Sequence, residues 1–427
     1  MKQYQRRNRS LQAQNPRIPD LPNEITIAIL AKLPVRSLLR FKNVSKQWQS
    51  WISNPESDLS KQRRRSSKAI FNQNGGSFHL INPKEDDKFN FQTLENPLSE
   101  SRIYKDKYSK PYLRLLGSCD GLVLISANKH IFLWNPATRF CNKVIELHLL
   151  TSDEHVISAG GLCFGSSKNE YKVLFYVYNK SVCDTDGAYA LVASLKDKKW
   201  RRIDCPCDMF SARDGITMHG RLHSRANLDN NYFNMHENLV GRYKDEHLRW
   251  NPDNDNEPMD GEESGESKWQ NHRLFGPRKE VICFDAISEK FHSLYKNDNA
   301  IVGLGVLNDC LCMTCVEFDK RLEILVMKEY GRKDSWTSLF VIRNSEITRP
   351  YIFYRSLFMS NNGKLALIVR HNGVVAYYPK NDSMQDILEL RYQNDISVIT
   401  YVESLISPIE YYWNEEQHIK ANEINTH

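Results

Sequence analysis

The stretch FLWNPATRFCNKVI, residues 132–145, joins two short apolar runs through a polar turn. The first run ends before Asn135, and an aromatic residue, Phe140, begins the second run. Short apolar runs on both sides of a polar turn predict two antiparallel strands joined as a hairpin. Units of the same kind occur at five other places between residues 68 and 410, where helical periodicity is lacking. This part of the chain is therefore predicted to consist of β-strands.

The residue that begins the second strand marks the repeat. It recurs as Phe89, Phe140, Trp200, Phe291, Trp336 and Met384, at intervals of 51, 60, 91, 45 and 48 residues. A repeat near 50 residues with a hairpin in each copy predicts a kelch-like β-propeller, with an open β-meander or a sandwich as the alternative. The longest interval is close to two repeats, so we expect six or seven blades, one of which has lost its signature. The late strand ISVITYV, residues 396–402, is expected to pair with an early strand and close the ring.

The N-terminal part of the chain has a different texture. The stretch LPNEITIAILAKLPVRSLLRFKNVSKQW, residues 21–48, has helical periodicity and is too short for a domain with a large core. We expect Asp20 to cap its first helix, with Pro22 in the first turn, where a missing N–H is tolerated. Pro34 is predicted to end that helix.

Apolar residues fall on two sides of this first predicted helix. One face carries Leu21, Ile25, Ala28, Ile29 and Leu33, whereas Ile27 and Leu30 fall on roughly the opposite side. Two apolar sides indicate a helix that packs both within its own unit and against something else.

A second helical run follows, beginning near Ser37. Its inner residues are predicted to be Phe41, Val44, Trp48, Trp51 and Ile52. Asn43 is a plausible break, so one helix or two short helices are both compatible with the pattern.

These motifs resemble a known family. Residues 21–52 resemble the F-box of plant F-box proteins in the Leu-Pro start, the second Leu-Pro, the Val-Arg-Ser-Leu-Leu-Arg-Phe run, and the Val-Ser-Lys and Trp that follow. The segments GSCDGLVLI, LWNPATRF, GLCFGSSKNEYKVL and LEILVMKEYGRKDSWTSLFVI resemble the F-box-associated interaction domain, which is related to kelch propellers. The sequence departs from that pattern at 220–224, so the third or fourth blade is the least certain match.

The resemblance implies an α+β multidomain protein: a small three-helix F-box followed by an all-β, propeller-like domain of kelch type. The domains are predicted as a disordered basic N-terminus (1–18), the F-box (19–60), a basic linker (61–68), the propeller (69–410) and a C-terminal tail (411–427). An acidic, disordered insertion is expected near 242–270, because residues 251–267 hold seven acidic residues and no Lys or Arg.

The implied function is that of a substrate-recognition subunit of a Skp–cullin–F-box ubiquitin ligase, without catalytic residues of its own. The F-box would bind a Skp-type adaptor and through it a cullin-RING ligase, and the propeller would bind a protein target. By motif match, the residues expected to face the adaptor are Leu21, Pro22, Ile25, Leu33, Pro34, Val35 and Leu38. The residues expected to form the F-box core are Ile29, Phe41, Val44, Trp48 and Ile52. A non-degradative scaffold and a glycan-binding propeller are the alternatives.

Composition limits the remaining classes. The net charge of +6 on 427 residues is mild and neither requires nor excludes a nucleic-acid partner. No nucleic-acid or membrane partner is expected. No apolar run approaches the roughly 18 residues of a membrane helix, and no apolar segment follows the basic start as in a secretory signal. We therefore expect a location in the cytoplasm or nucleus, and cysteines that are mostly reduced.

Some motifs permit a sharper reading, but each has a plainer explanation. The thiols of CLCMTC (310–315) have a spacing that could ligate a metal, but in a strand they are expected to be buried; Cys205 and Cys207 are expected in a turn. GSCDG (117–121) superficially resembles a nucleophile turn but is better explained as an Asp-Gly hairpin turn. No metal or cofactor is expected. The basic run KQRRRSSK (61–68) is either a solvated linker or an import or phosphate-binding signal.

Overall fold

The computed structural model describes much of the chain between residues 21 and 408. The described residues are 21–53, 57, 59, 68–73, 77–83, 89–99, 113–127, 130–146, 155–165, 170–179, 189–205, 213–226, 280–296, 299–307, 309–317, 321–343, 355–359, 366–370, 373–378, 380–381, 383–389 and 397–408. The predicted disordered N-terminus (1–18), linker residues 61–67, the acidic insertion and the C-terminal tail lie outside them.

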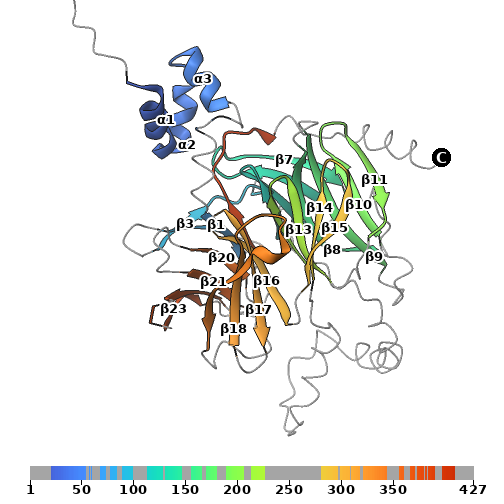
Figure 1. The fold of residues 1–427 in the computed structure, drawn as a ribbon. Helices are drawn as coiled ribbons and strands as arrows, with labels where there is room; N and C mark the ends of the chain where they lie inside the picture. The colour runs from blue at the N-terminus through green and yellow to red at the C-terminus, as the bar shows by residue number, and fades with distance from the viewer. Residues whose placement is uncertain are drawn as a thin grey trace, which may run out of the picture. The chain divides into compact units, whose positions relative to one another are not determined.

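The chain divides into two compact units between Gln62 and Arg63. The first unit, called the helical unit here, contains three helices, α1 (Asn23–Lys32), α2 (Val35–Phe41) and α3 (Lys46–Ser53) (Figure 1). The second, called the β unit, contains 24 strands and one short 3-10 helix, η6 (Lys333–Ser335), within the described residues. No helix in the described part of either unit is long and apolar enough to cross a membrane.

The strands of the β unit form six antiparallel four-stranded sheets in the described residues. In sheet order, the first three are β24 (Ser397–Tyr401), β1 (Lys68–Gln73), β2 (Ser77–Pro83), β3 (Phe89–Leu94); β4 (Leu113–Cys119), β5 (Leu122–Ala127), β6 (His130–Asn135), β7 (Phe140–Glu146); and β8 (His155–Gly165), β9 (Glu170–Asn179), β10 (Tyr189–Ser194), β11 (Lys199–Ile203).

The other three sheets have the same meander order. They are β12 (Arg213–Met218), β13 (Arg221–Ala226), β14 (Glu280–Asp285), β15 (Lys290–Lys296); β16 (Ala300–Leu307), β17 (Cys310–Glu317), β18 (Arg321–Met327), β19 (Trp336–Ile342); and β20 (Arg355–Met359), β21 (Ala366–Arg370), β22 (Gly373–Tyr378), β23 (Ser383–Glu389).

The repeated anchor residue begins the outer strand of each sheet. Phe89, Phe140 and Trp336 are the first residues of β3, β7 and β19, and the other three anchors are the second residues of β11, β15 and β23. The sequence repeat therefore corresponds to one blade, as predicted.

The long interval between Trp200 and Phe291 does not contain a degenerate extra blade in the described residues. Strand β13 pairs directly with β14, from Arg221 opposite Asp285 to Ala226 opposite Glu280. The extra length, residues 227–279, therefore interrupts one blade between its second and third strands. Residues 219–226, which include the departure from the family pattern at 220–224, form β13 and the turn before it.

The first strands of the sheets form a ring. β24 contacts β4, and the contacts continue from β4 to β8, β12, β16 and β20 and back to β24. The ring closes as predicted, because β24 pairs with β1 inside one sheet, with Tyr401 opposite Lys68 and Ile399 opposite Ile70. Early and late parts of the chain thereby share a single blade.

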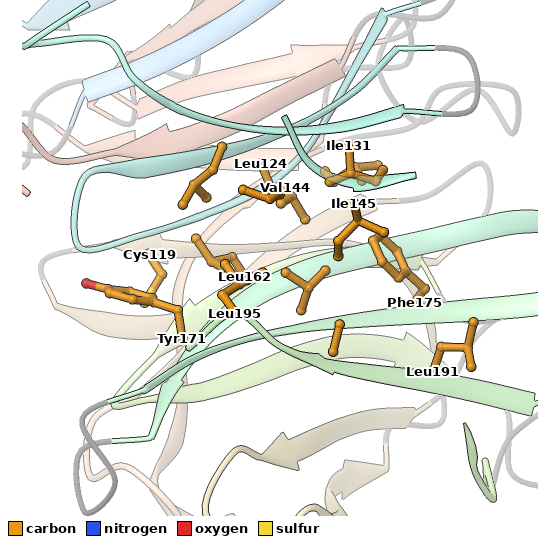
Figure 2. Packing of buried hydrophobic residues seen from close by; sticks show 14 of the residues in the cluster. Cys119, Leu124, Ile131, Val144, Ile145, Leu162, Tyr171, Phe175, Leu191 and Leu195 are labelled. Atoms are coloured by element: carbon orange, nitrogen blue, oxygen red, sulfur yellow. The ribbon is translucent and has the colours of Figure 1, made fainter. Parts of the chain in front are cut away.

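The core lies between neighbouring sheets. One cluster joins the β4–β7 sheet, through residues such as Leu124 and Ile145, to Leu162, Phe175 and Leu191 of the β8–β11 sheet (Figure 2). Similar clusters join the other neighbours. Burial on both faces explains why the inner strands are nearly continuous apolar runs.

Glycines let three inner strands approach each other closely. A Cβ atom on Gly215 of β12 would lie 2.4 Å from the Gly160 oxygen of β8 and 3.0 Å from the Leu116 oxygen of β4. A Cβ atom on Gly117 would lie 3.3 Å from the Cα atom of Gly161. Backbone therefore fills the space where β4, β8 and β12 meet, and only glycine fits there.

Candidate functional site

Two prolines set the limits of helix α1. Pro22 is its N-cap residue, and the Pro22 carbonyl accepts a hydrogen bond from the Thr26 N–H at 3.0 Å. The cap therefore lies two residues later than the predicted cap, Asp20, which is outside the described residues. At the other end Leu33 is extended, as expected for a residue that precedes proline, and α2 begins directly after Pro34.

Helix α1 is apolar on two sides, and only one side is covered within the described residues. Ile27 and Leu30 are buried, whereas Ile25 and Ile29 are each 48% exposed. Leu21, just before the helix, is 59% exposed and lies at the i, i+4, i+8 spacing with them. Leu21, Ile25 and Ile29, called the α1 stripe here, form an apolar surface on the solvent side of the helix.

Helices α2 and α3 are separate, with the break close to Asn43. The Ser45 hydroxyl caps α3 by accepting a hydrogen bond from the Trp48 N–H at 3.1 Å. The rings of Phe41 and Trp48 meet edge to face at 5.5 Å, and the Gln47 amide donates to the Asn23 side chain at 3.3 Å. Side-chain contacts therefore hold α3 against both α2 and the start of α1.

The structure places the seven predicted adaptor-facing residues in different environments. Leu21, Pro22, Ile25 and Pro34 are exposed, and Leu33 is half-buried. Val35 and Leu38 are buried in the helical unit, Leu38 completely, which corrects the prediction that these two face an adaptor. Both lie on the inner side of α2, so they hold the unit together.

The predicted core needs the opposite correction. Ile52 is buried, and Phe41, Trp48 and Trp51 are half-buried. Ile29 and Val44 are exposed, Val44 to 60%, so neither lies in the core. Ile29 belongs to the α1 stripe because it follows Ile25 by one helical turn.

Two further leucines of the helical unit were not singled out from the sequence. Leu39 is 38% exposed although its neighbour Leu38 is fully buried, and Leu59 is buried. Because residues 38 and 39 are both leucines, the residue type does not indicate which of them faces solvent.

In the β unit, the cysteine motif at 310–315 and the GSCDG turn at 117–121 have structural roles. Cys312 and Cys315 of β17 belong to two different core clusters, on opposite faces of the sheet, and burial raises the pKa of the Cys315 thiol to about 12. The described residues include no group of three or more His, Cys, Asp or Glu that could hold a metal ion. The Asp120-Gly121 pair forms the predicted hairpin turn between β4 and β5, with φ of 49° and 80°.

A buried polar cluster links the β12–β15 sheet to the β18–β19 connection. His223 is fully buried; its Nδ1 lies 3.0 Å from the Ile216 carbonyl oxygen, and its Nε2 lies 2.8 Å from the Tyr330 hydroxyl. Burial lowers the pKa of His223 to about 4 and raises that of Tyr330 to about 12. Both groups are therefore neutral near pH 7, and they join two blades.

Asn135, from the segment quoted first, ties the late part of the chain to the β4–β7 sheet. Its amide donates to the carbonyl oxygens of Ser404 at 3.1 Å and Ile406 at 2.8 Å. Its side-chain oxygen accepts a hydrogen bond from the Ala137 N–H at 2.9 Å in its own turn. One buried side chain thus holds both a hairpin turn and the segment that follows β24.

Comparisons with known proteins agree with this two-unit organisation. Residues 18–60 match the F-box domain, and residues 69–236 match the F-box associated beta propeller domain. An F-box/kelch-repeat protein of Arabidopsis thaliana is 22% identical over 91% of this chain and 96% of its own length. The F-box protein CPR1 of the same plant is 21% identical over 87% of this chain and 84% of its own length.

Among solved structures, TolB from Acinetobacter baumannii aligns with 83% of this chain and 69% of its own. The TM-score is 0.38 at 8% identity, too low to bear on function.

Proposed function

Because this chain is an F-box protein with an F-box-associated β-propeller domain, we propose that it is the substrate-recognition subunit of a Skp–cullin–F-box ubiquitin ligase. The helical unit docks on a Skp-type adaptor, which connects it to a cullin-RING ligase. The β unit binds the target protein. Ubiquitination of that target then leads to its degradation by the proteasome.

The α1 stripe is the observation that carries this proposal. Three large aliphatic side chains at helical spacing remain exposed on a small unit, at 48–59% of their surface. Covering them with a partner would remove apolar area from water, at roughly 25 cal/mol per Å². A few such anchors usually dominate the affinity of an interface.

The mechanism is proximity. A target held by the β unit stays near the ubiquitin thioester carried by the conjugating enzyme, so its lysines react at a raised effective concentration. In this proposal the chain itself forms and breaks no covalent bond. Its location is the cytoplasm, the nucleus or both, where such ligases meet their targets.

The glycine-packed inner strands suggest where a target binds. Because the backbones of β4, β8 and β12 meet at Gly117, Gly161 and Gly215, a ligand has no room between these three strands. We expect the target to bind elsewhere, on the faces of the β unit or along the outer strands of its sheets.

A matched pair of isoleucines tests the proposal. Ile25 in the helical unit is 48% exposed, and Ile287 in the β unit is 47% exposed. With Ile25→Asp, co-purification of the full chain with a Skp-type adaptor should fall at least about tenfold, because a charge would be buried in an apolar contact. Ile287→Asp should leave co-purification unchanged. Equal behaviour of the two variants would count against the proposal.

The lifetime of the captured proteins distinguishes a degradative receptor from a non-degradative scaffold. If the chain is a degradative receptor, proteins captured with it should become longer-lived when the proteasome is blocked, and also in cells that carry the Ile25→Asp variant. Captured proteins whose lifetime responds to neither change would instead indicate a non-degradative scaffold.

A further inference from the structure

The outer strand β11 and the turn before it are strongly basic. Between Lys196 and Asp204 the chain has five cations and two carboxylates, and Lys196, Lys199, Arg201 and Arg202 are exposed. The outer strands β3 and β19 carry no charged residue, and β23 carries only acidic ones. β7 carries one lysine and one glutamate, and β15 carries two lysines in seven residues. With three cations in five residues, β11 is the most basic of the six outer strands.

The next blade supports the same patch. Glu289, in the turn between β14 and β15, forms an ion pair with Arg201 and another with the buried Lys172. Lys290, the next residue in the chain, is exposed. Glu289 is itself only 14% exposed and lies between the two cations that it pairs with.

The side chains of β11 are partly ordered in advance. The Arg202 guanidinium lies over the Tyr189 ring, 4.2 Å from its centroid, and Arg201 is held by Glu289. Side chains that are already fixed lose less conformational entropy when a ligand binds.

The backbone of β11 has one open side. Among the described residues β10 is its only partner in the sheet, with Arg201 opposite Val192 and Lys199 opposite Ser194. Every second backbone N–H and C=O of an outer strand points away from the sheet and can pair with an added strand. A row of cations beside such an edge favours an added strand with acidic side chains.

We propose that β11 is the docking edge for an extended acidic segment of the captured target protein, which adds to the β8–β11 sheet as a fifth strand. This inference rests on the proposed function and identifies the class of target. Lys199 and Arg201 project from one side of the strand and Arg202 from the other, so carboxylates on both sides of the added strand find a cation. A strand edge suits a peptide better than a nucleic acid, because a nucleic acid lacks the N–H and C=O ladder.

The test uses the full chain and a labelled synthetic peptide that repeats Glu-Glu-Thr-Thr, which places glutamates on both sides of an extended strand. Its affinity is measured by fluorescence anisotropy. Lys199→Glu with Arg202→Glu should weaken binding at least about tenfold. The matched control is Lys333→Glu with Lys380→Glu, which changes the net charge equally at two exposed lysines elsewhere in the β unit and should have little effect.

A second peptide separates strand addition from plain charge attraction. Methylation of its alternate backbone nitrogens removes N–H donors but keeps every carboxylate, and it should also weaken binding about tenfold. The proposal is overturned if the methylated peptide binds as well as the parent, if the control variant weakens binding equally, or if an equally charged single-stranded DNA competes as well as the peptide. Adaptor co-purification is unaffected by all of these outcomes, so a failure here is distinguishable from a failure of the proposed receptor role.

Discussion

The helical unit and the β unit differ in how many of their large apolar side chains are exposed to solvent. Within the described residues the helical unit exposes five of them between residues 21 and 44, whereas the much longer β unit exposes four, Phe91, Phe140, Ile287 and Leu339. The β unit buries its apolar residues between neighbouring blades. Large apolar side chains that stay exposed on so small a unit are typical of an interaction surface.

The largest effect is expected from a change inside the β unit. Gly215→Ala would place a methyl group 2.4 Å from the Gly160 carbonyl oxygen, between backbones that cannot move aside easily. The free energy of unfolding of the β unit should fall by about 3 kcal/mol or more. Denaturant unfolding measures it, and adaptor binding under native conditions serves as the control that should not change.

Gly165→Ala is the companion variant. The added methyl group would meet its nearest atom, the Ala286 oxygen, at an ordinary 3.5 Å. Stability should stay within about 0.5 kcal/mol of the parent. If both glycine variants were equally stable, close packing of the inner strands would not be the reason for glycine at residue 215.

Substitutions at the adjacent residues Ile29 and Leu30 of α1 should affect binding and stability separately. Leu30→Ala should destabilise the helical unit by about 3 kcal/mol, because Leu30 is buried. Ile29→Ala should leave stability nearly unchanged and weaken adaptor binding instead. Thermal unfolding and adaptor titration of both variants check this; a stability loss at Ile29 like that at Leu30 would return Ile29 to the core.

A smaller effect is expected from acid. The pKa of buried His223 is about 4 in the folded chain and near 6.5 when unfolded, so the unfolded state takes up the proton first. The contribution of neutral His223 to the free energy of unfolding is fully present above about pH 6.5 and is lost as the pH falls toward about 4. Between about pH 7 and pH 5 the β unit should lose about 2 kcal/mol.

His223→Gln isolates this contribution. The variant should be less stable at neutral pH but should show a shallower loss of stability on acidification, as measured by denaturant unfolding across the pH range. An unchanged slope would mean that other groups cause the acid sensitivity.

The smallest effect is expected at Asn135. Asn135→Ala removes the bonds to Ser404, Ile406 and Ala137 and should cost about 1–2 kcal/mol. Asn142→Ala removes one bond to the Pro408 carbonyl oxygen and should cost less. Equal costs would mean that Asn135 does not hold the late segment.

The sequence was most informative where a pattern repeats. The anchors from Phe89 to Met384 marked the outer strand of every sheet, because the same hairpin is built six times. The 91-residue interval misled, since spacing alone does not separate a lost blade from an insertion between β13 and β14.

The helical unit could be predicted only in part. Helical periodicity identified two apolar sides on α1, but it gives the angle between side chains and not the direction of the core. Ile29 and Ile27 are both isoleucines, and the arrangement of α2 and α3 determines which one is covered. Adaptor contact by the α1 stripe remains a prediction.

The closure of the ring by β24 determines the order in which the two units can fold during translation. Tyr401 pairs with Lys68, about 330 residues earlier, so the first blade cannot be completed until nearly the whole β unit has been translated. The helical unit leaves the ribosome long before that moment, and its contacts among the described residues are local, so they form quickly. Under the proposed function, a nascent chain would therefore present helix α1 to an adaptor before its β unit has closed. A product that stops short of Ser397 would then occupy adaptors without a closed β unit.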